Sequence, residues 1–152
     1  MLPTTTSRVE QNTAAEANER IRLRMEDSIY YFAEHPHEIG SRLRELDAEW
    51  DIERTLEANA ATLGLAGVAM GAFVDKRWLL FPAAISGFLL QHALQGWCPP
   101  IVLFRKQGVR TSTEIDQERY ALKALRGDFV LTDETEGLSH DEKVQRVLAT
   151  LH

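Results

Sequence analysis

Two long charge-free runs in the middle of the chain constrain its fold more than any other feature. The first, residues 58–74, reads ANAATLGLAGVAMGAFV, and the second, residues 78–104, reads WLLFPAAISGFLLQHALQGWCPPIVLF. Only an Asp-Lys-Arg triplet separates them, although charged residues make up 26% of the whole chain. Two apolar helices joined by a short charged turn are typical of a membrane protein. We therefore predict a two-helix transmembrane hairpin over residues 58–104.

The lengths of the two runs leave a soluble alternative open. As a helix, the first run is roughly 25 Å long, slightly shorter than the ~30 Å hydrocarbon core of a bilayer. In the second run Pro99 and Pro100 end a regular helix, which leaves about 20 residues for a span. The alternative is a soluble helical protein with a buried hairpin. Such a protein must cover both helices with apolar residues, of which the flanks have few, so membrane insertion is favoured.

The flanks of the hairpin are polar and acidic. Residues 1–57 carry 13 Asp and Glu against 7 Arg, and the whole chain has a formal net charge of −6. This acidity argues against nucleic acid as a partner. The start of the chain has neither the basic nor the apolar region of a cleavable signal peptide, so we expect none. The single cysteine excludes an internal disulfide framework.

Helical patterns account for both flanks, so we predict an all-α protein with amphipathic helices on either side of the hairpin. Residues 1–13 are expected to be disordered, and residues 14–57 to form the first amphipathic flank. One helix is expected from Ala14 to Ala33. A second begins at Pro36 and carries an apolar stripe at helical spacing, formed by Ile39, Leu43, Leu46 and Trp50.

The second amphipathic helix meets the hairpin without an intervening proline, and no glycine interrupts it between Ser41 and Leu63. We expect it either to run straight into the first apolar helix or to bend near Glu57–Asn59. The carboxylates along it alternate through an exposed helix and are expected to be solvated. They are Asp47, Glu49, Asp51 and Glu53.

Residues 105–152 are predicted to form a helical tail. Thr111 and Glu114 make a capping box, and the helix that they begin should run to Arg126 and end at Gly127. A further short helix is expected after a second capping box, formed by Ser139 and Glu142.

The first apolar helix carries a regular face of small residues at positions i, i+4, i+7 and i+11, namely Ala60, Gly64, Gly67 and Gly71. Lipid provides no hydrophobic reason for helices to associate, so close backbone approach along a smooth face supplies dispersion contacts instead. We interpret this face as a helix–helix interface, either within the hairpin or across a homodimer. Glycine and alanine are, however, simply common in membrane helices.

Three polar residues of the second apolar helix, Gln91, His92 and Gln95, fall within an arc of roughly 100°. Polar side chains on one sector of a membrane helix are expected to face protein or trapped water. Interhelical hydrogen bonding is the simplest interpretation, and a polar path or a small binding site is the alternative. No second ligand lies at a spacing that matches His92, so we expect no metal and no cofactor.

The string Gly96-Trp97-Cys98-Pro99-Pro100 places the single cysteine at a helix end near the membrane interface. A carboxyl helix end carries partial negative charge, which disfavours a reactive thiolate. Structural packing of Cys98 is the first interpretation, and a reactive or sulfur-carrying thiol is the second.

Residues 55–106 resemble the YgaP-like inner-membrane domain family. The matching features are Asn59, the small-residue first helix, the short turn and a second helix that ends in Gly96-Trp97-Cys98-Pro99. The resemblance implies a bacterial two-helix membrane domain that tends to form dimers. In the namesake this domain is attached to a rhodanese, a sulfurtransferase with a catalytic cysteine. Here no second cysteine is present to head a rhodanese loop, so the family's enzyme activity does not carry over.

Two functional hypotheses follow. The first is a non-enzymatic integral membrane module that forms homodimers or higher oligomers and presents cytoplasmic helices to a protein partner or to membrane lipid. The second is sulfur or thiol handling through Cys98 with a separate sulfurtransferase partner, and a transport path along the polar sector of an oligomer is a minor third. No phosphate-binding glycine loop, nucleophile elbow or zinc spacing points to an enzyme. The basic residues that flank the hairpin favour a multi-pass protein with both termini in the cytoplasm.

Overall fold

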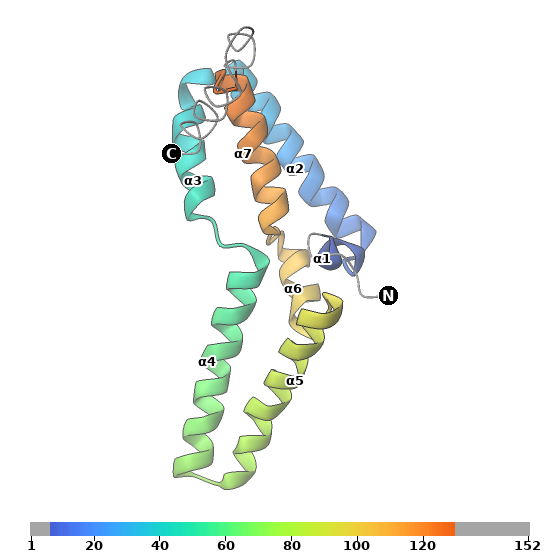
Figure 1. The fold of residues 1–152 in the computed structure, drawn as a ribbon, viewed down its shortest axis with the longest axis vertical. Coiled ribbons are helices and arrows are strands. Elements are labelled where there is room, and N and C mark those ends of the chain that lie inside the picture. The colour runs from blue at the N-terminus through green and yellow to red at the C-terminus, as the bar shows by residue number, and fades with distance from the viewer. Residues whose placement is uncertain (1–6, 130–152) are drawn as a thin grey trace, which may run out of the picture.

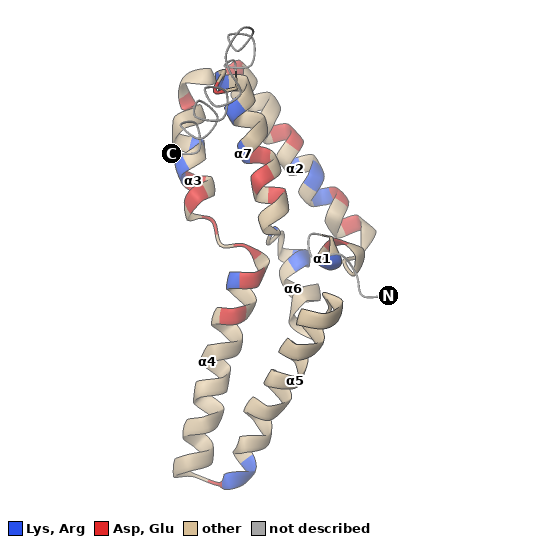
Figure 2. Ribbon diagram, in the orientation of Figure 1, with Lys and Arg blue, Asp and Glu red and all other residues tan. Residues whose placement is uncertain are grey.

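A computed structural model of the chain describes residues 7–129, and every regular element in that range is helical (Figure 1). The described residues thus confirm the prediction of an all-α protein. The molecule is elongated, with a charged helical head at one end and a nearly uncharged hairpin at the other (Figure 2).

The head combines segments from both flanks. Its elements are α1 (Arg8–Gln11), α2 (Ala15–Glu34), the 3₁₀ turn η1 (Pro36–Glu38), α3 (Ile39–Ala48) and α7 (Ser112–Arg126). Helix α7 packs against both α2 and α3. The capping box of Thr111 and Glu114 and the end of α7 at Gly127 are confirmed.

The apolar stripe of α3 forms the core of the head. Its first three residues are buried together with two residues of α7 in one cluster, which consists of Ile39, Leu43, Leu46, Ile115 and Leu122. Trp50, the fourth residue of the stripe, is 48% exposed. Helix α7 therefore covers the first three residues of the stripe and leaves Trp50 outside this core.

The hairpin projects from the head as two antiparallel helices. They are α4 (Ile52–Phe73) and α5 (Leu80–Gln95), joined by the 3₁₀ turn η2 (Lys76–Leu79), and α6 (Pro99–Gln107) returns the chain to the head (Figure 1). Helix α5 ends at Gln95, four residues before Pro99. Gly96 stops it with φ at 76°, and a Cβ there would lie 2.5 Å from the carbonyl oxygen of Arg8.

The connection between head and hairpin is a break rather than a continuous or bent helix. Helix α3 ends at Ala48, and α4 begins at Ile52 after the side chain of Asp51 accepts a hydrogen bond from the amide of Arg54. The amide of Ile52 also donates to the carbonyl oxygen of Arg110, with 2.8 Å between the atoms. Both expectations for this junction are wrong, because a side-chain cap and a contact with the distant flank start a new helix here.

The start of the described chain is more ordered than expected. Arg8–Gln11 form α1 within the segment that was predicted to be disordered, and Val9 is buried against the base of the hairpin. The amphipathic pattern is too short in four residues to reveal this docking. The predicted helix after Ser139 lies outside the described residues.

Candidate functional site: the apolar hairpin and its base

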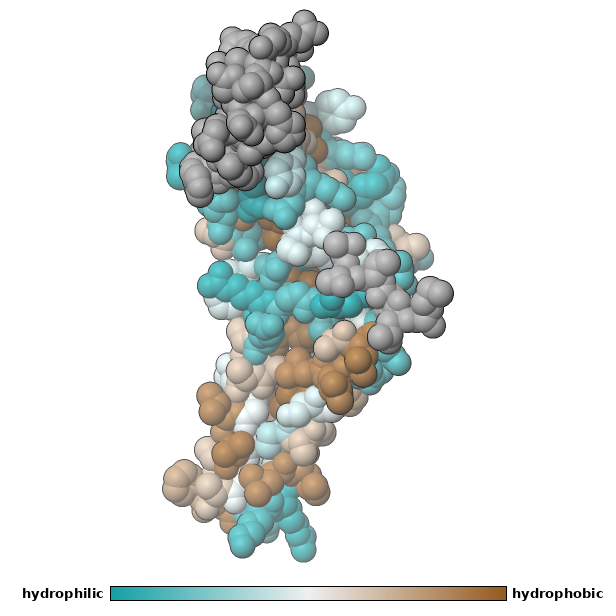
Figure 3. All heavy atoms as spheres, in the orientation of Figure 1, coloured by the Kyte–Doolittle hydropathy of each residue, from teal (hydrophilic) through white to brown (hydrophobic). Residues whose placement is uncertain are grey.

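The outer surface of the hairpin is apolar and exposed. In Figure 3 hydrophobic residues gather over the hairpin, between the hydrophilic head and the hydrophilic tip. Leu65, Phe73 and Leu80 are 73%, 88% and 74% exposed, and many other large apolar side chains of α4 and α5 are at least partly exposed. Soluble monomers rarely expose contiguous apolar surface of this extent.

One helical stretch of the described chain, Pro36–Phe73, contains an 18-residue window that is long and apolar enough to cross a membrane. Only 22% of that window is buried inside the protein, whereas the core helix of a soluble protein is mostly buried. The apolar part of this stretch belongs to α4. Helix α5, with 16 residues, is shorter than such a window.

Tryptophan side chains mark both ends of the apolar zone. Trp78 lies in η2 at the tip, whereas Trp50 and Trp97 lie in the links that precede α4 and follow α5. The guanidinium carbon of Arg54 lies 4.3 Å from the centre of the Trp50 ring. Amphipathic indole rings are typical of the two membrane–water interfaces.

Two of the four small residues on α4 lie at the contact within the hairpin. A Cβ on Gly67 would lie 2.7 Å from Cδ of Pro82, and a Cβ on Gly71 would lie 2.5 Å from Cδ2 of Leu79. These glycines allow the second helix to approach closely. Ala60 is buried, but a Cβ on Gly64 would have no neighbour within 4 Å.

The polar residues near the end of α5 have different surroundings rather than one shared sector. His92 is buried, and its Nε2 lies 2.7 Å from a carboxylate oxygen of Glu53, whose other oxygen accepts a hydrogen bond from Arg8 at 2.8 Å. The hydrogen bond with His92, together with the charge and the hydrogen bond of Arg8, lowers the pKa of Glu53 despite partial burial. Gln91 is half-buried, and the side chain of Gln95 is exposed.

This ion-paired joint fixes the base of the hairpin to the amino-terminal flank. Asn12 adds a hydrogen bond from its side-chain amide to the carbonyl oxygen of Gln95, at 2.9 Å. The Nδ1 atom of His92 is buried and has no hydrogen-bond partner among the described residues. Of the three polar side chains, that of His92 therefore attaches α5 to α4.

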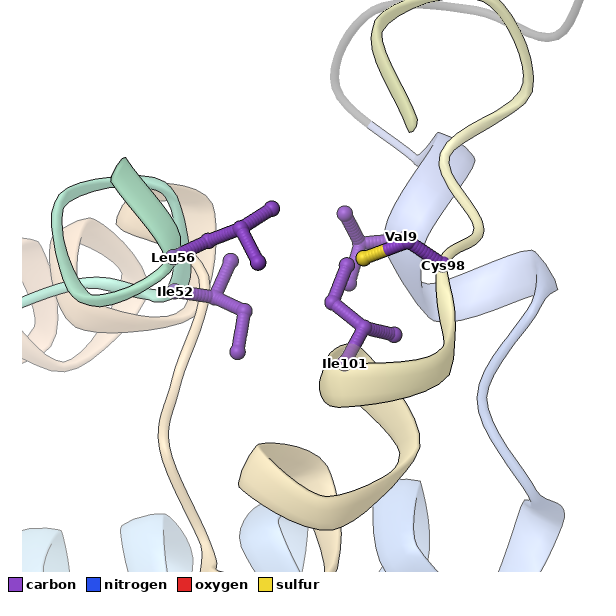
Figure 4. Packing of buried hydrophobic residues seen from close by; sticks show 5 residues of the cluster. All are labelled: Val9, Ile52, Leu56, Cys98 and Ile101. Atoms are coloured by element: carbon purple, nitrogen blue, oxygen red, sulfur yellow. The ribbon is translucent and has the colours of Figure 1, made fainter. Parts of the chain in front are cut away.

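Cys98 is packed inside the base of the hairpin. Its side chain contacts a small apolar cluster, and the residue is 1% exposed (Figure 4). The cluster joins α1, α4 and α6 and also contains Val9, Ile52, Leu56 and Ile101. Cys98 is the N-cap residue of α6 rather than the carboxyl end of a longer helix, so the helix-dipole argument from the sequence does not apply. Its burial keeps a sulfur donor away from the thiol in this conformation.

The head contains buried ion pairs that sequence reasoning missed. Arg105, 1% exposed, donates to both carboxylate oxygens of Glu114 at 2.6 and 2.7 Å, and to Asn18 at 2.8 Å. Glu118 is fully buried and accepts hydrogen bonds from Arg42, Arg110 and Ser28. Glu114 and Glu118 lie four residues apart on one face of a helix, where two like charges repel each other. This spacing could have indicated that arginines from other segments pair with them.

The environment of Glu118 favours its charged form. Burial alone disfavours ionisation, but the hydrogen bonds from Arg42, Ser28 and Arg110 outweigh it and lower the pKa of Glu118. Burial disfavours the charged form of Arg110, but its hydrogen bonds with Glu49 and Glu118 outweigh this and raise the pKa of Arg110. The pairs therefore remain charged inside the head.

The expectation that the carboxylates of the first flank are simply solvated is wrong for two of them. Glu49 receives a hydrogen bond from Arg110 at 2.8 Å, and Glu53 is part of the joint with His92. Both bonds join residues that are far apart in the sequence, which is why helical periodicity alone suggested an exposed face.

Among residues 7–129, no group of three or more His, Cys, Asp or Glu side chains is arranged to hold a metal ion. Comparison of the chain with protein-family models, with curated proteins and with solved structures finds no match. The resemblance to YgaP-like domains therefore stays a prediction.

Proposed function

We propose that the chain is a non-enzymatic integral membrane module. In this proposal the hairpin inserts into the bilayer, and the charged head lies at the cytoplasmic surface, where it is available to a protein partner. The exposed apolar surface of α4 and α5 is the observation that carries the proposal, because water would have to solvate it otherwise.

The dimensions of the hairpin support a span. The 16 charge-free residues of α4, 58–73, and the 16 residues of α5 each rise about 24 Å, against a hydrocarbon core of ~30 Å. Local thinning of the bilayer accommodates such a mismatch at fractions of a kcal/mol per Å. The tryptophans at both ends then lie at the two interfaces, and Lys76 and Arg77 reach the far side.

Carbonate extraction of membranes from cells that express the full chain tests insertion. Retention in the pellet supports the proposal, and release into the supernatant contradicts it. Topology is tested with Asp75→Cys in a Cys98→Ala background and a membrane-impermeant maleimide. We expect labelling of intact cells from outside. Labelling only after the cytoplasmic side is opened would contradict a two-pass span with cytoplasmic termini.

We also propose that the hairpins associate as homodimers. Gly64 on α4 and Gly87 on α5 have open space where a Cβ would lie, so each leaves a smooth site for another helix. Replacing Gly64 with Leu should reduce the dimer fraction that light scattering measures in mild detergent. An unchanged mass would contradict Gly64 as part of the interface.

A further inference from the structure

The two hairpin helices enclose an apolar cleft near the base, roofed by α6. The cleft has a volume of about 250 Å³. Its walls include Ala60 and Leu63 of α4, Phe88 and Leu89 of α5, and Leu103 and Phe104 of α6. No charged residue lines it. The two helices approach more closely nearer the tip, at Gly67 and Gly71.

The cleft is continuous with the exposed apolar surface of the hairpin. Leu63, Phe88 and Leu103 line it and are still 50%, 45% and 56% exposed, so its mouth opens to the side. Its volume lies below the ~300–1,000 Å³ of sites for drug-sized ligands, which suits a narrow, flexible occupant. An empty apolar space forfeits the dispersion contacts of its walls, so an adjacent apolar chain will fill it.

Helix α6 carries an exposed positive charge about one turn after the cleft-lining residue Leu103. Lys106 is exposed and follows Leu103 by three residues, so the two side chains share one face of α6. Lysine near a membrane surface attracts anionic headgroups. The apolar walls and the cation thus match the two parts of an anionic phospholipid.

We propose that the cleft between α4, α5 and α6 binds one acyl chain of an anionic phospholipid, with Lys106 beside its phosphate. The proposal rests on insertion of the hairpin, because the bilayer supplies the ligand. The bound lipid fills the space that α6 and the diverging helices leave open, and it supports the joint between hairpin and head.

The test uses the full chain in bilayer nanodiscs that contain phosphatidylglycerol with a photoactivatable group on one acyl chain. Adducts are mapped by mass spectrometry. We expect them to be concentrated on cleft-lining residues such as Leu63 and Leu103, above the level at more exposed outer residues such as Leu65 and Leu90. Uniform labelling of the whole apolar surface, or cross-links from the cleft to a second copy of the chain, would overturn the proposal.

Two variants sharpen this test. Ala60→Phe fills the cleft and should reduce adducts there to the level of the outer surface. Ala69→Phe, nine residues on and therefore on the opposite face of α4, is the matched control and should leave them unchanged. If Ala60→Phe fails to fold, Lys106→Gln tests whether Lys106 contacts the lipid phosphate. It removes a charge worth about 1 kcal/mol, so adducts of the anionic lipid should fall about fivefold.

Lys123→Gln, on α7 of the head, controls for the loss of one positive charge. Equal adduct yields for Lys106→Gln and Lys123→Gln would overturn the role of Lys106. Carbonate extraction of every variant separates this proposal from the preceding one. Variants that stay in the pellet but show no preferred adducts contradict the lipid site alone, whereas release of the unmodified chain contradicts insertion itself.

Discussion

The helices of the head and those of the hairpin pack through opposite kinds of contact. In the head, Glu118 is fully buried and its charge is balanced by Arg42 and Arg110. In the hairpin, the contact between α4 and α5 is made by glycines, and large apolar side chains point outward. One region buries charge inside and keeps a polar surface, and the other keeps charge out and leaves its apolar surface exposed.

The packing of each region indicates whether it requires water or lipid around it. A buried ion pair is costly to desolvate and is kept only with several hydrogen bonds, as in the head. A glycine contact provides little hydrophobic burial in water but permits dispersion contacts that suffice where lipid covers the outside. The comparison therefore separates a part built for water from a part suited to a bilayer, and the following experiments test that separation.

Lowering the pH should produce the largest difference in stability between the head and the hairpin. The pKa of Glu118 is lower in the folded head than its ordinary value of about 4.3, so its charge stabilises the fold fully above that value. This contribution is lost as the pH falls through the lowered pKa of the folded state. We expect hydrogen exchange in detergent to show that α7 loses protection at pH values below about 4, while the half of α5 nearer the tip, away from the pair of His92 and Glu53, keeps it. Equal loss in both helices would contradict the comparison.

Removing Glu118 should produce the largest effect of a single substitution. Glu118→Ala leaves the buried guanidinium of Arg110 without one of its partners and should lower the free energy of unfolding by about 3–5 kcal/mol. Thermal unfolding followed by circular dichroism in mild detergent measures the change. Glu45→Ala is the matched control, because Glu45 also pairs with Arg42 but is exposed, and such pairs contribute about 0–1 kcal/mol. Similar losses for both variants would show that burial of Glu118 has no special role.

Closing the glycine contact should destabilise the hairpin by less. Gly71→Leu places a side chain where Leu79 already lies, and overpacking of this kind costs about 1–3 kcal/mol. Ala69→Leu, on the same helix at an exposed position outside the small-residue face, is the control. We expect hydrogen exchange of α5 to increase for Gly71→Leu and not for Ala69→Leu. Faster exchange in the control variant than in Gly71→Leu would show that α5 packs against a different face of α4.

The smallest effect is expected at Cys98. Cys98→Ala removes one buried sulfur from the apolar cluster at the base and should cost about 1 kcal/mol in the free energy of unfolding. In the folded protein the thiol should react slowly with a persulfide donor, as followed by mass spectrometry, and quickly after unfolding. Fast persulfide formation on the folded chain would favour the sulfur-handling hypothesis instead.

Contacts between helices could not be predicted from the sequence. The pattern of Ile39, Leu43 and Leu46 correctly indicated a buried helix face, but it did not identify α7 as the covering element. The carboxylates Glu49 and Glu53 looked solvated because their partners, Arg110 and His92, lie 61 and 39 residues away. Periodicity describes one helix at a time, so it cannot assign such partners.

Hydropathy, helix propensity and capping act over a few neighbouring residues, so the helical class of the described residues, the position of the apolar hairpin and the capping box of α7 could be predicted from the chain alone. Only the folded molecule reveals the break before Ile52, the docking of Val9 at the hairpin base and the buried ion pairs of Arg105 with Glu114 and of Arg42 with Glu118. These features depend on contacts such as Arg42 with Glu118, 76 residues apart, whose energy exists only once the chain has brought the two flanks together.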